Sequence, residues 1–514
     1  MGRFTSVVLI DRLPGLRRLM RIPSQLIGRC PFQGDYTTSA IPLFAPGSGR
    51  PSLPFPHPWN YHDPIRILET YFWNAEQEQG SRRHSRYLQV PGFDPVLITR
   101  DPELIRAITI DTGDQPGQFD RDTLPSTGIA RATGKDSLLY ANGAEWRKQK
   151  KLAMPPFGKT SLYQPEQFSE FEETFRHTIR QRLDVLEQHL QNKAEPVQVA
   201  LEPEIKAIML EMLTNNFFGA SIEYDLIRNE FVPALEHVIE HIVRDTVLNK
   251  LDIPVKRLPA LSKRGVLTKE SYRKFEQLTD LVLEARDDSK GLWGQFRSDA
   301  PNHLIRSNIR VFLAGALEAT TSFASWTISH LARSPQVQEE VHAEVARIER
   351  YTSEALANAT QLSNVMEETL RLTPSLYFLP RRATANKSVE MQNKQKLVVP
   401  KGTHILLDVW HANRHEDHWG VEQTGYPADK FQPDRWNNIR AETNSAKRFL
   451  HFGFGHGPRI CPGTHLGKLE VALVVGALVK LFRFKATSPT CGVIAGVSTK
   501  PADGTIVELA KRDF

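Results

Sequence analysis

One short loop constrains this chain more than any other part of its sequence. The stretch FGFGHGPRICPG, residues 452–463, contains four glycines and two prolines, a composition that excludes a regular helix or strand. The apolar segment HLGKLEVALVVGALVKLF follows at once and predicts a long buried helix. Cys461, one of three cysteines among 514 residues, therefore lies in a tight loop just before a helix begins.

This loop is suited to holding a metal-binding thiolate. Cys30, Cys461 and Cys491 form no close pair, which indicates neither a disulfide framework nor a CxxC zinc site, and a reducing compartment is expected. A thiolate binds iron well, but it must be kept deprotonated by a metal, by amide donors or by positive charge. The glycines and the N-terminus of the next helix supply such donors. Because Arg459 can reach an anion and Phe454 can pack on a flat apolar surface, the loop is typical of haem ligation.

The spacing Phe454-x-x-Gly457-x-Arg459-x-Cys461-x-Gly463 resembles the haem-binding motif of the cytochrome P450 family. A glycine-rich phosphate loop is the alternative, but the stretch lacks the third glycine of GxGxxG, and no lysine follows as in a P-loop. The resemblance implies that Cys461 is the metal ligand of haem b. It also implies that Phe454, Arg459 and Gly463 belong to the cofactor-binding residues.

Two further motifs follow in the family's order. EETLR places Glu368 and Arg371 one turn apart on a helix, and FQPDRW supplies Arg435. Alone, such a Glu–Arg pair is more often a solvated surface pair. The resemblance implies instead a buried Glu–Arg–Arg core that braces the haem-binding side, and such a core is better understood as fixing geometry than as adding stability.

The haem propionates are expected to meet basic residues. GAEWRKQKKLAMPPF resembles the family's W-x-x-x-R helix, in which Trp146 fits and Lys150 stands where arginine is usual. Lysine neutralises a carboxylate, although without the bidentate fork of arginine. The family also places a propionate-binding arginine after the Glu–Arg helix. LPRRA offers Arg381 and Arg382, and the sequence does not choose between them.

FLAGALEATTSF, residues 312–323, resembles the family's distal helix, in which an acid and an alcohol deliver protons for oxygen activation. Anchored on Glu318, the usual threonine position holds Ala319, and Thr320 falls one place late. Anchored on Ala314-Gly315, one extra residue precedes the acid, as a local π-bulge would allow. We expect Glu318 and Thr320 to be the catalytic pair. The alternatives are a relay through water or a substrate hydroxyl, and hydroxyl groups that only bond back to helix carbonyls.

The histidine-rich stretch DVWHANRHEDHW contains His411, His415 and His418. His411 and His415 are four residues apart, but the stretch reads as a loop. It also resembles the family segment that precedes the FQPDRW element. No zinc site is therefore expected here.

Along the chain, the pattern is mainly helical with a small β region and shows no clear domain break. Helical periodicity dominates residues 165–350, whereas residues 86–99 and 388–407 predict short strands. Asp101 is expected to cap a helix that starts at the following proline. The resemblance implies a single-domain cytochrome P450 fold over residues 59–514, after an N-terminal arm and proline-rich lead-in over residues 1–58.

The resemblance implies a monooxygenase that hydroxylates or epoxidises a lipophilic organic substrate with O2 and electrons from a separate NAD(P)H-dependent reductase. A role in microbial secondary metabolism is a further expectation. Substrate contacts are expected from residues 112–134, residues 205–220, Phe312, Ala316 and the apolar stretch 375–379. The alternatives are atypical haem-thiolate chemistry, such as a peroxygenase or a rearrangement, and a non-catalytic haem protein.

The net charge of +6 and the sequence pI near 9.0 are too weak a signal for nucleic acid, but they suit an acidic redox partner or an anionic membrane surface. No apolar run is long enough to predict a transmembrane helix, and VVLI near the N-terminus is too short for a secretory signal. The arginine-rich residues 12–22 suit either a membrane interface or a surface-packed arm. We expect a cytoplasmic protein, or one peripherally associated with the endoplasmic reticulum membrane.

Overall fold

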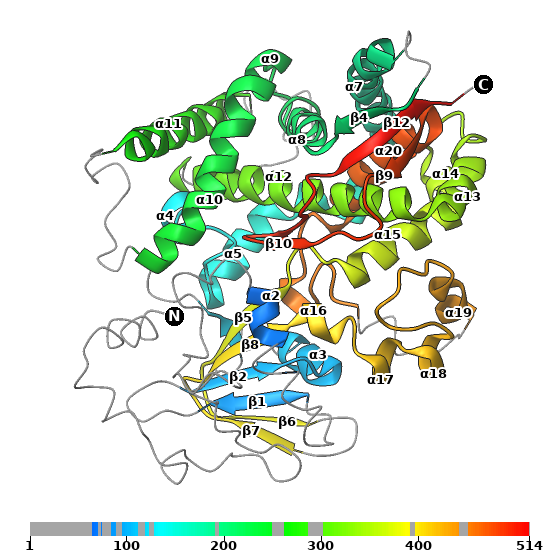
Figure 1. Ribbon diagram of the computed structural model, residues 1–514. Coiled ribbons are helices and arrows are strands. Elements are labelled where there is room, and N and C mark those ends of the chain that lie inside the picture. The colour runs from blue at the N-terminus through cyan, green and yellow to red at the C-terminus, as the bar shows by residue number, and fades with distance from the viewer. Residues whose placement is uncertain are drawn as a thin grey trace.

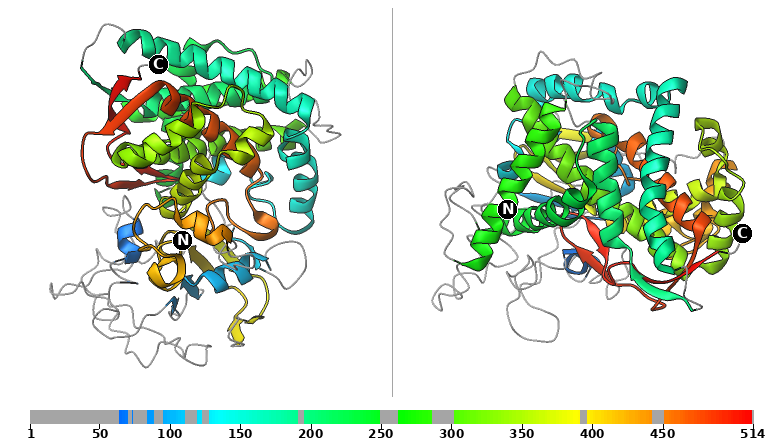
Figure 2. Two further views of the ribbon diagram at one scale, coloured as in Figure 1. Left: turned by 90° about the vertical axis from the view of Figure 1, so that its right-hand side faces the viewer. Right: turned by 90° about the horizontal axis from the view of Figure 1, so that it is seen from above.

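The computed structural model describes residues 64–69, 73, 84–88, 95–110, 119–122, 128–190, 195–248, 262–285, 302–390, 396–441 and 451–512. The predicted arm and lead-in, residues 1–58, lie outside these ranges. Helices fill the upper part of Figure 1 and a five-stranded sheet fills the lower part, and the left view of Figure 2 shows the same division. The prediction of a mainly α fold with a small β region is confirmed.

Long helices form most of the upper part. They are α7 (Pro165–Leu190), α8 (Glu202–Glu211), α10 (Val232–Leu248), α11 (Lys263–Glu284), α12 (Asn302–Arg333), α13 (Pro335–Val345), α15 (Thr360–Leu372) and α20 (Thr464–Leu481). Shorter helices and turns are α2 (Pro64–Leu68), α3 (Pro102–Ile110), α4 (Gly128–Thr133), α5 (Gly143–Ala153), η5 (Pro155–Phe157), α6 (Lys159–Leu162), η6 (Met212–Phe217), α9 (Tyr224–Leu226), η7 (Ile227–Phe231), α14 (Ser353–Asn358), α16 (Val409–Ala412), α17 (Glu416–Trp419), α18 (Val421–Thr424), α19 (Arg435–Ala441) and η11 (Gly457–Arg459).

Helix α12 is the central element. It crosses the middle of the molecule in Figure 1 and packs against α8, α11, α15 and α20, so most of its side chains are buried. It is α-helical from Asn302 to Arg333, so the π-bulge that one alignment of the distal motif requires is not formed. Turns of π-helix occur instead at η6 and η7.

The five-stranded sheet has the order β1 (Ser85–Leu88), β2 (Val96–Thr99), β8 (His404–Asp408), β5 (Phe378–Ala383) and β3 (Phe119–Arg121). Only the β2–β8 pair is parallel among these neighbours. The predicted strands within residues 86–99 are confirmed as the antiparallel pair β1–β2. Asp101 begins α3 as expected, because its Oδ1 accepts hydrogen bonds from the N–H groups of Glu103 at 2.9 Å and Leu104 at 3.3 Å.

Three smaller sheets complete the β structure of the described ranges. They are β4 (Val197–Ala200), β12 (Ile506–Lys511) and β9 (Phe482–Ala486); β10 (Val493–Ala495) with β11 (Thr499–Pro501); and β6 (Lys387–Glu390) with β7 (Lys396–Val399). The strands predicted within residues 388–407 are confirmed as parts of β6, β7 and β8. None of the helices in the described ranges combines the length and hydropathy that crossing a bilayer needs.

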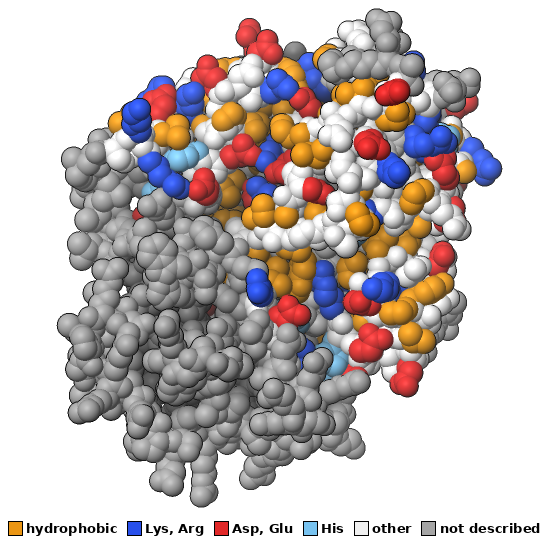
Figure 3. Space-filling view, in the orientation of Figure 1, with side chains coloured by type: hydrophobic (Ala, Val, Ile, Leu, Met, Phe, Trp, Pro, Cys, Tyr) orange, Lys and Arg blue, Asp and Glu red, His pale blue; other side chains and the backbone are white. Residues whose placement is uncertain are grey.

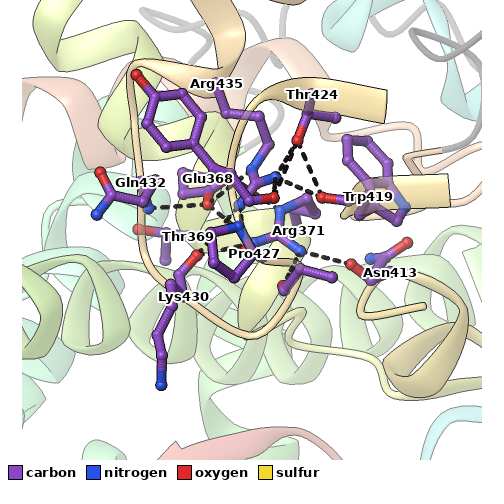
Figure 4. A network of polar contacts seen from close by, with 12 residues as sticks. Glu368, Thr369, Arg371, Asn413, Trp419, Thr424, Pro427, Lys430, Gln432 and Arg435 are labelled. Atoms are coloured by element: carbon purple, nitrogen blue, oxygen red, sulfur yellow. Dashed lines mark hydrogen bonds and ion pairs between the residues drawn. The ribbon is translucent and has the colours of Figure 1, made fainter. Parts of the chain in front are cut away.

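A buried ionic network holds α15 against the segment that leads to α19 (Figure 4). Arg371 Nε and Nη2 donate to the two Glu368 carboxylate oxygens at 2.9 and 2.8 Å, and Arg435 Nε donates to the same carboxylate at 3.2 Å. All three side chains are fully buried. The remaining N–H groups of the two arginines donate mainly to backbone carbonyls, which are those of Asn413, Trp419, Tyr426, Pro427, Ala428 and Lys430.

The network holds the side chains of Glu368, Arg371 and Arg435 in one arrangement, because their hydrogen-bonding groups have partners within it. Burial raises the pKa of Glu368, but the charges of Arg371 and Arg435 and the hydrogen bonds around it outweigh this effect, and the pKa is lowered. The carboxylate therefore contributes stability above the ordinary pKa of glutamate, and this contribution is lost as the pH falls through the folded-state pKa. The expected Glu–Arg–Arg core is present in the structure.

Replacing Glu368 with alanine leaves two buried guanidinium groups without their carboxylate, which we expect to lower the free energy of unfolding by about 3–5 kcal/mol. Urea unfolding followed by far-UV circular dichroism measures this change. The matched control is Glu270→Ala, because Glu270 and Arg273 form a Glu–Arg pair of the same spacing that is exposed to solvent. We expect little change from the control. Equal effects of the two substitutions would contradict the bracing role of the buried network.

Candidate functional site

The cysteine loop is held between two helices by close backbone contacts. At Gly453 a Cβ atom would lie 2.8 Å from the Cβ of Leu370 in α15. Gly457 has φ +72°, and a Cβ atom there would collide with the carbonyl oxygen of Thr109 at the end of α3. These two glycines are therefore required by the approach of the loop to its neighbours as well as by its turns.

Cys461 lies three residues before the first residue of α20 and is positioned by the loop itself. Its N–H donates to the carbonyl oxygen of Phe454 at 2.9 Å, and its own carbonyl accepts from the Thr464 hydroxyl at 2.7 Å. The side chain keeps exposed surface. Surrounding protein nevertheless desolvates the thiol and raises its pKa to about 11, although the Gly463 N–H and the charge of Arg121 lower it. The amide donors expected from the sequence are therefore outweighed, and a bound metal is needed to hold the thiolate at neutral pH.

Three arginines gather near this thiol from separate elements. Strand β3 pairs with β5 so that Arg121 lies directly opposite Arg381, and directly opposite residues share one face of a sheet. Burial lowers the pKa of Arg121. Burial and the charges of Arg121 and Arg459 lower the pKa of Arg381 well below its usual range. The Arg121 Nε is buried and has no hydrogen-bond partner within the ranges that the structure describes.

The same strand pairing separates the two arginines that the sequence left open. Arg382 lies opposite Asp120 on the other face of the sheet and is only half-buried, whereas Arg381 is 2% exposed. Arg381 is thus the one that lies with Arg121 and Arg459. Arg121 is not among the site residues predicted from the sequence, because no motif covers β3. The alternation of side chains between the two faces of a strand, applied to residues 119–121 and 378–383, could have placed Arg121 on the same face as Arg381.

Helix α5 brings its predicted residues to the loop. The Arg459 guanidinium carbon lies 4.1 Å from the centroid of the Trp146 ring, and the Lys150 ammonium lies 5.0 Å from the same ring. Lys150 Nζ donates to the carbonyl oxygen of Pro458 at 3.0 Å, and Arg459 Nη2 donates to the carbonyl of Ala141 at 2.8 Å. Trp146, Lys150 and Arg459 therefore form one cluster that ties α5 to the cysteine loop.

The distal pair predicted from the sequence is not brought together. Each residue of an α-helix is rotated by about 100° from the one before it. Side chains two residues apart therefore point to nearly opposite faces of the helix. Glu318 faces β11, where its Oε1 accepts from Ser498 Oγ at 2.8 Å and lies 3.2 Å from Lys500 Nζ. Thr320 donates its hydroxyl to the Ala316 carbonyl within α12, and its methyl group lies against α20. The roles of Glu318 and Thr320 remain predictions, but the two side chains lie on different faces of α12.

Another face of α12 is open. Gly315 is exposed in the middle of this mostly buried helix, and a Cβ atom there would meet nothing within 4 Å. Ala319, four residues on, lies on the same face and is half-buried. Leu376 and Ile460, both otherwise suited to a core, are 44% and 41% exposed. Ile460 directly precedes Cys461, and Leu376 lies in the apolar stretch 375–379 that is expected to contact substrate.

Two of the residues expected to contact substrate, Phe312 and Ser375, are buried among other side chains. Phe312 is buried and packs at a centroid distance of 4.9 Å on Phe157, which also stacks on Phe217 at 4.9 Å. Ser375 is buried and donates to the Ala319 carbonyl at 3.0 Å. Residues 111–118 and 123–127, which include most of the expected substrate loop, lie outside the described ranges.

Haem fits the residues of this site. A thiol is a soft ligand for iron, and the guanidinium groups of Arg121, Arg381 and Arg459 are suited to paired carboxylates. Phe454, which packs edge-on against Phe323 at 6.3 Å, adds an aromatic ring beside the loop. A ligand with a metal, an apolar disc and two carboxylates satisfies all of these groups together.

Comparison with known proteins agrees with this geometry. A family model described as Cytochrome P450 matches residues 81–493. Cytochrome P450 3A16 of Mus musculus is 23% identical over 473 residues, covering 85% of this chain and 86% of the relative. Cytokinin hydroxylase of Arabidopsis thaliana is 25% identical over 451 residues, covering 82% and 80%. Because the family model matches well over half of the chain, we conclude that this chain belongs to the cytochrome P450 family.

Proposed function

We propose that this chain hydroxylates or epoxidises a lipophilic organic substrate at a haem held by Cys461. Family membership makes the chain a haem monooxygenase with haem b as its cofactor, and members of this family use NAD(P)H-derived electrons delivered through a reductase. The observation that supports the finer assignment is the gathering of one thiol and three guanidinium groups, of which those of Arg381 and Arg459 are buried.

When bound, haem supplies the activation of O2 and the transfer of one oxygen atom to the substrate, while the other atom leaves as water. Cys461 Sγ holds the metal, and Arg121, Arg381 and Arg459 neutralise the propionates. Trp146 shields one side of the Arg459 guanidinium from water. Lys150 holds α5 against the loop through the Pro458 carbonyl.

Proton supply on the open face of α12 differs from the expected acid–alcohol pair. Gly315 and Ala319 carry no proton donor in their side chains. Glu318 is engaged by Lys500 and Ser498 on another face. We therefore propose that water, or a hydroxyl group of the substrate, donates protons beside Ala319. The sequence allows this route as well as the acid–alcohol pair.

The substrate is proposed to be lipophilic because the accessible positions around the distal helix are apolar or small. Gly315, Ala316, Leu376 and Leu379 offer no charge to a bound molecule. Phe312, which lies on the same helix, belongs to a buried ring cluster with Phe157 and Phe217. A role in microbial secondary metabolism remains a prediction, and the relatives named above come from an animal and a plant.

A separate reductase and the cellular location are also proposals. The net charge of +6 suits an acidic redox partner. Figure 3 shows acidic and basic side chains intermingled over the described residues of one face, so we do not place the docking surface there. A cytoplasmic location, or peripheral contact with the endoplasmic reticulum membrane, rests on the N-terminal residues outside the described ranges.

A peroxygenase is the second candidate function, because Glu318 and Thr320 lie on different faces of α12 and do not form an acid–alcohol pair. Hydrogen peroxide brings both the oxygen atom and the two electrons, so the substrate gains one oxygen and water is released without a reductase. This reaction needs less proton delivery than O2 activation does. Consumption of NAD(P)H coupled to product in the presence of a reductase distinguishes the monooxygenase from the peroxygenase.

The identity of the metal ligand is tested by Cys461→Ser. We expect this variant to lose the red-shifted carbonyl band of the reduced carbon-monoxide difference spectrum, because a serine hydroxyl is a much poorer ligand for iron than a thiolate. Cys491→Ser is the matched control and should keep the full band. Persistence of the band in Cys461→Ser would refute the ligand assignment.

The arginine cluster is tested by Arg121→Gln. Loss of one charge-assisted hydrogen bond, worth about 1.5–3 kcal/mol, should speed haem loss about 10–100-fold. Transfer of haem to excess apomyoglobin measures this rate. Arg382→Gln, on the opposite face of the same sheet, should change it little. The assignment fails if Arg382→Gln loses haem quickly while Arg121→Gln retains it.

The proton supply is tested by the coupling of electrons to product. Thr320→Val should change the coupled fraction by less than about twofold, since the Thr320 hydroxyl only bonds back to its own helix. Ala319→Thr places a hydroxyl on the open face and should alter the coupled fraction. If Thr320→Val uncouples the reaction several-fold and Ala319→Thr does nothing, the acid–alcohol pair predicted from the sequence is the correct relay.

A further inference from the structure

Three imidazole rings from two distant segments meet beside the five-stranded sheet. His84 directly precedes β1, His415 directly precedes α17, and His418 lies within α17; both elements lie in the lower half of Figure 1. One ring nitrogen of each histidine lies within 4.8 Å of those of the other two. The ring centroids are 4.4 Å apart for His84 and His415, 5.5 Å for His415 and His418, and 5.9 Å for His84 and His418.

A carboxylate lies beside two of the three rings. Asp417 Oδ2 lies 3.8 Å from His84 Nε2 and 3.9 Å from His415 Nδ1. The His84 and Asp417 side chains are 25% and 37% exposed, whereas that of His415 is 6% exposed. The group is therefore anchored in the protein on one side and reached by solvent on the other.

We propose that His84, His415 and His418 bind one divalent transition-metal ion through their imidazole nitrogens, and Zn²⁺ is the best match for this ligand set. Imidazole nitrogen favours zinc, copper, nickel and cobalt, whereas magnesium and calcium prefer oxygen ligands. Zinc binds nitrogen at about 2.0–2.1 Å, so tetrahedral ligand atoms lie about 3.4 Å apart. Nitrogens that already lie within 4.8 Å reach this spacing through small side-chain movements.

This proposal departs from the expectation from the sequence that no zinc site forms here. His411 does not join the cluster, because its Nδ1 lies 2.7 Å from Asp408 Oδ2 and is engaged by that carboxylate. The third imidazole comes instead from His84, which lies 331 residues before His415 (415 − 84). Only the fold brings it there.

The metal would join two parts of the molecule. His84 leads into β1 at the edge of the sheet. His418 precedes Trp419, whose backbone carbonyl accepts a hydrogen bond from Arg435 of the buried network. A metal held by both segments would fasten the sheet to the segment that supports Glu368. This role is structural and does not depend on the proposed oxidation.

A simpler role for His415 is capping α17, since its Nδ1 accepts a hydrogen bond from the Asp417 N–H at 3.2 Å. The substitution His415→Asn separates the two roles. Asparagine caps helices well, but its amide is a poor ligand for zinc. A capping role alone predicts that this variant behaves like the wild type in the presence of zinc.

The test uses haem-loaded protein, so that Cys461 is not available to added zinc. After treatment with a chelator, we expect equilibrium dialysis against Zn²⁺ to give one zinc per chain and, at a hundredfold excess over Kd, a rise of about 3 °C in the apparent Tm. His84→Ala, His418→Ala and His415→Asn should each weaken binding at least about tenfold. His177→Ala, at an exposed histidine outside the cluster, should leave it unchanged.

Zinc X-ray absorption of the wild-type protein provides a readout that needs no variant. We expect a first shell of nitrogen and oxygen with the multiple scattering of imidazole. A sulfur shell, a shell of oxygen alone, or wild-type binding no tighter than that of His84→Ala and His418→Ala would overturn the proposal.

Discussion

The clustering of Arg121, Arg381 and Arg459 beside the Cys461 thiol is the interaction that organises the site and the elements around it. Burial lowers the pKa of Arg121, burial and the charges of Arg121 and Arg459 lower the pKa of Arg381, and burial raises the pKa of Cys461 to about 11. Each group on its own is thus held in an unfavourable environment. Two carboxylates and a metal relieve these costs together, which explains why one ligand organises the whole site.

The surrounding architecture keeps these groups in place. The register of β3 against β5 sets Arg121 opposite Arg381, and the close packing of Gly457 on α3 fixes the height of the cysteine loop. The buried network at Glu368 connects α15, on which Gly453 packs, to the segment that leads to α19. A network with every polar arm satisfied resists small displacements, and such rigidity suits a ligand that must be held on both sides.

The sequence could predict what lies within continuous motifs. The loop around Cys461 follows from residue spacing, the buried pair of Glu368 and Arg371 and the role of Trp146 follow from the family resemblance, and the short strands follow from turn residues and β-branched runs. What depends on tertiary register could not be predicted. Arg121 lies in a three-residue strand without a motif. Its alignment with Arg381 appears only when β3 pairs with β5. In the same way, His84 meets His415 only in the folded chain, and the continuity of α12 decides that Glu318 and Thr320 point apart.

The central claim is that the sulfur of Cys461 binds the iron of haem. Iron X-ray absorption of the purified ferric protein tests this bond most directly, because sulfur and nitrogen scatterers differ in distance and amplitude. The structure predicts one sulfur ligand at bonding distance in addition to the four nitrogens of the porphyrin. A first shell of nitrogen and oxygen alone, in protein that carries a full complement of haem, would contradict it.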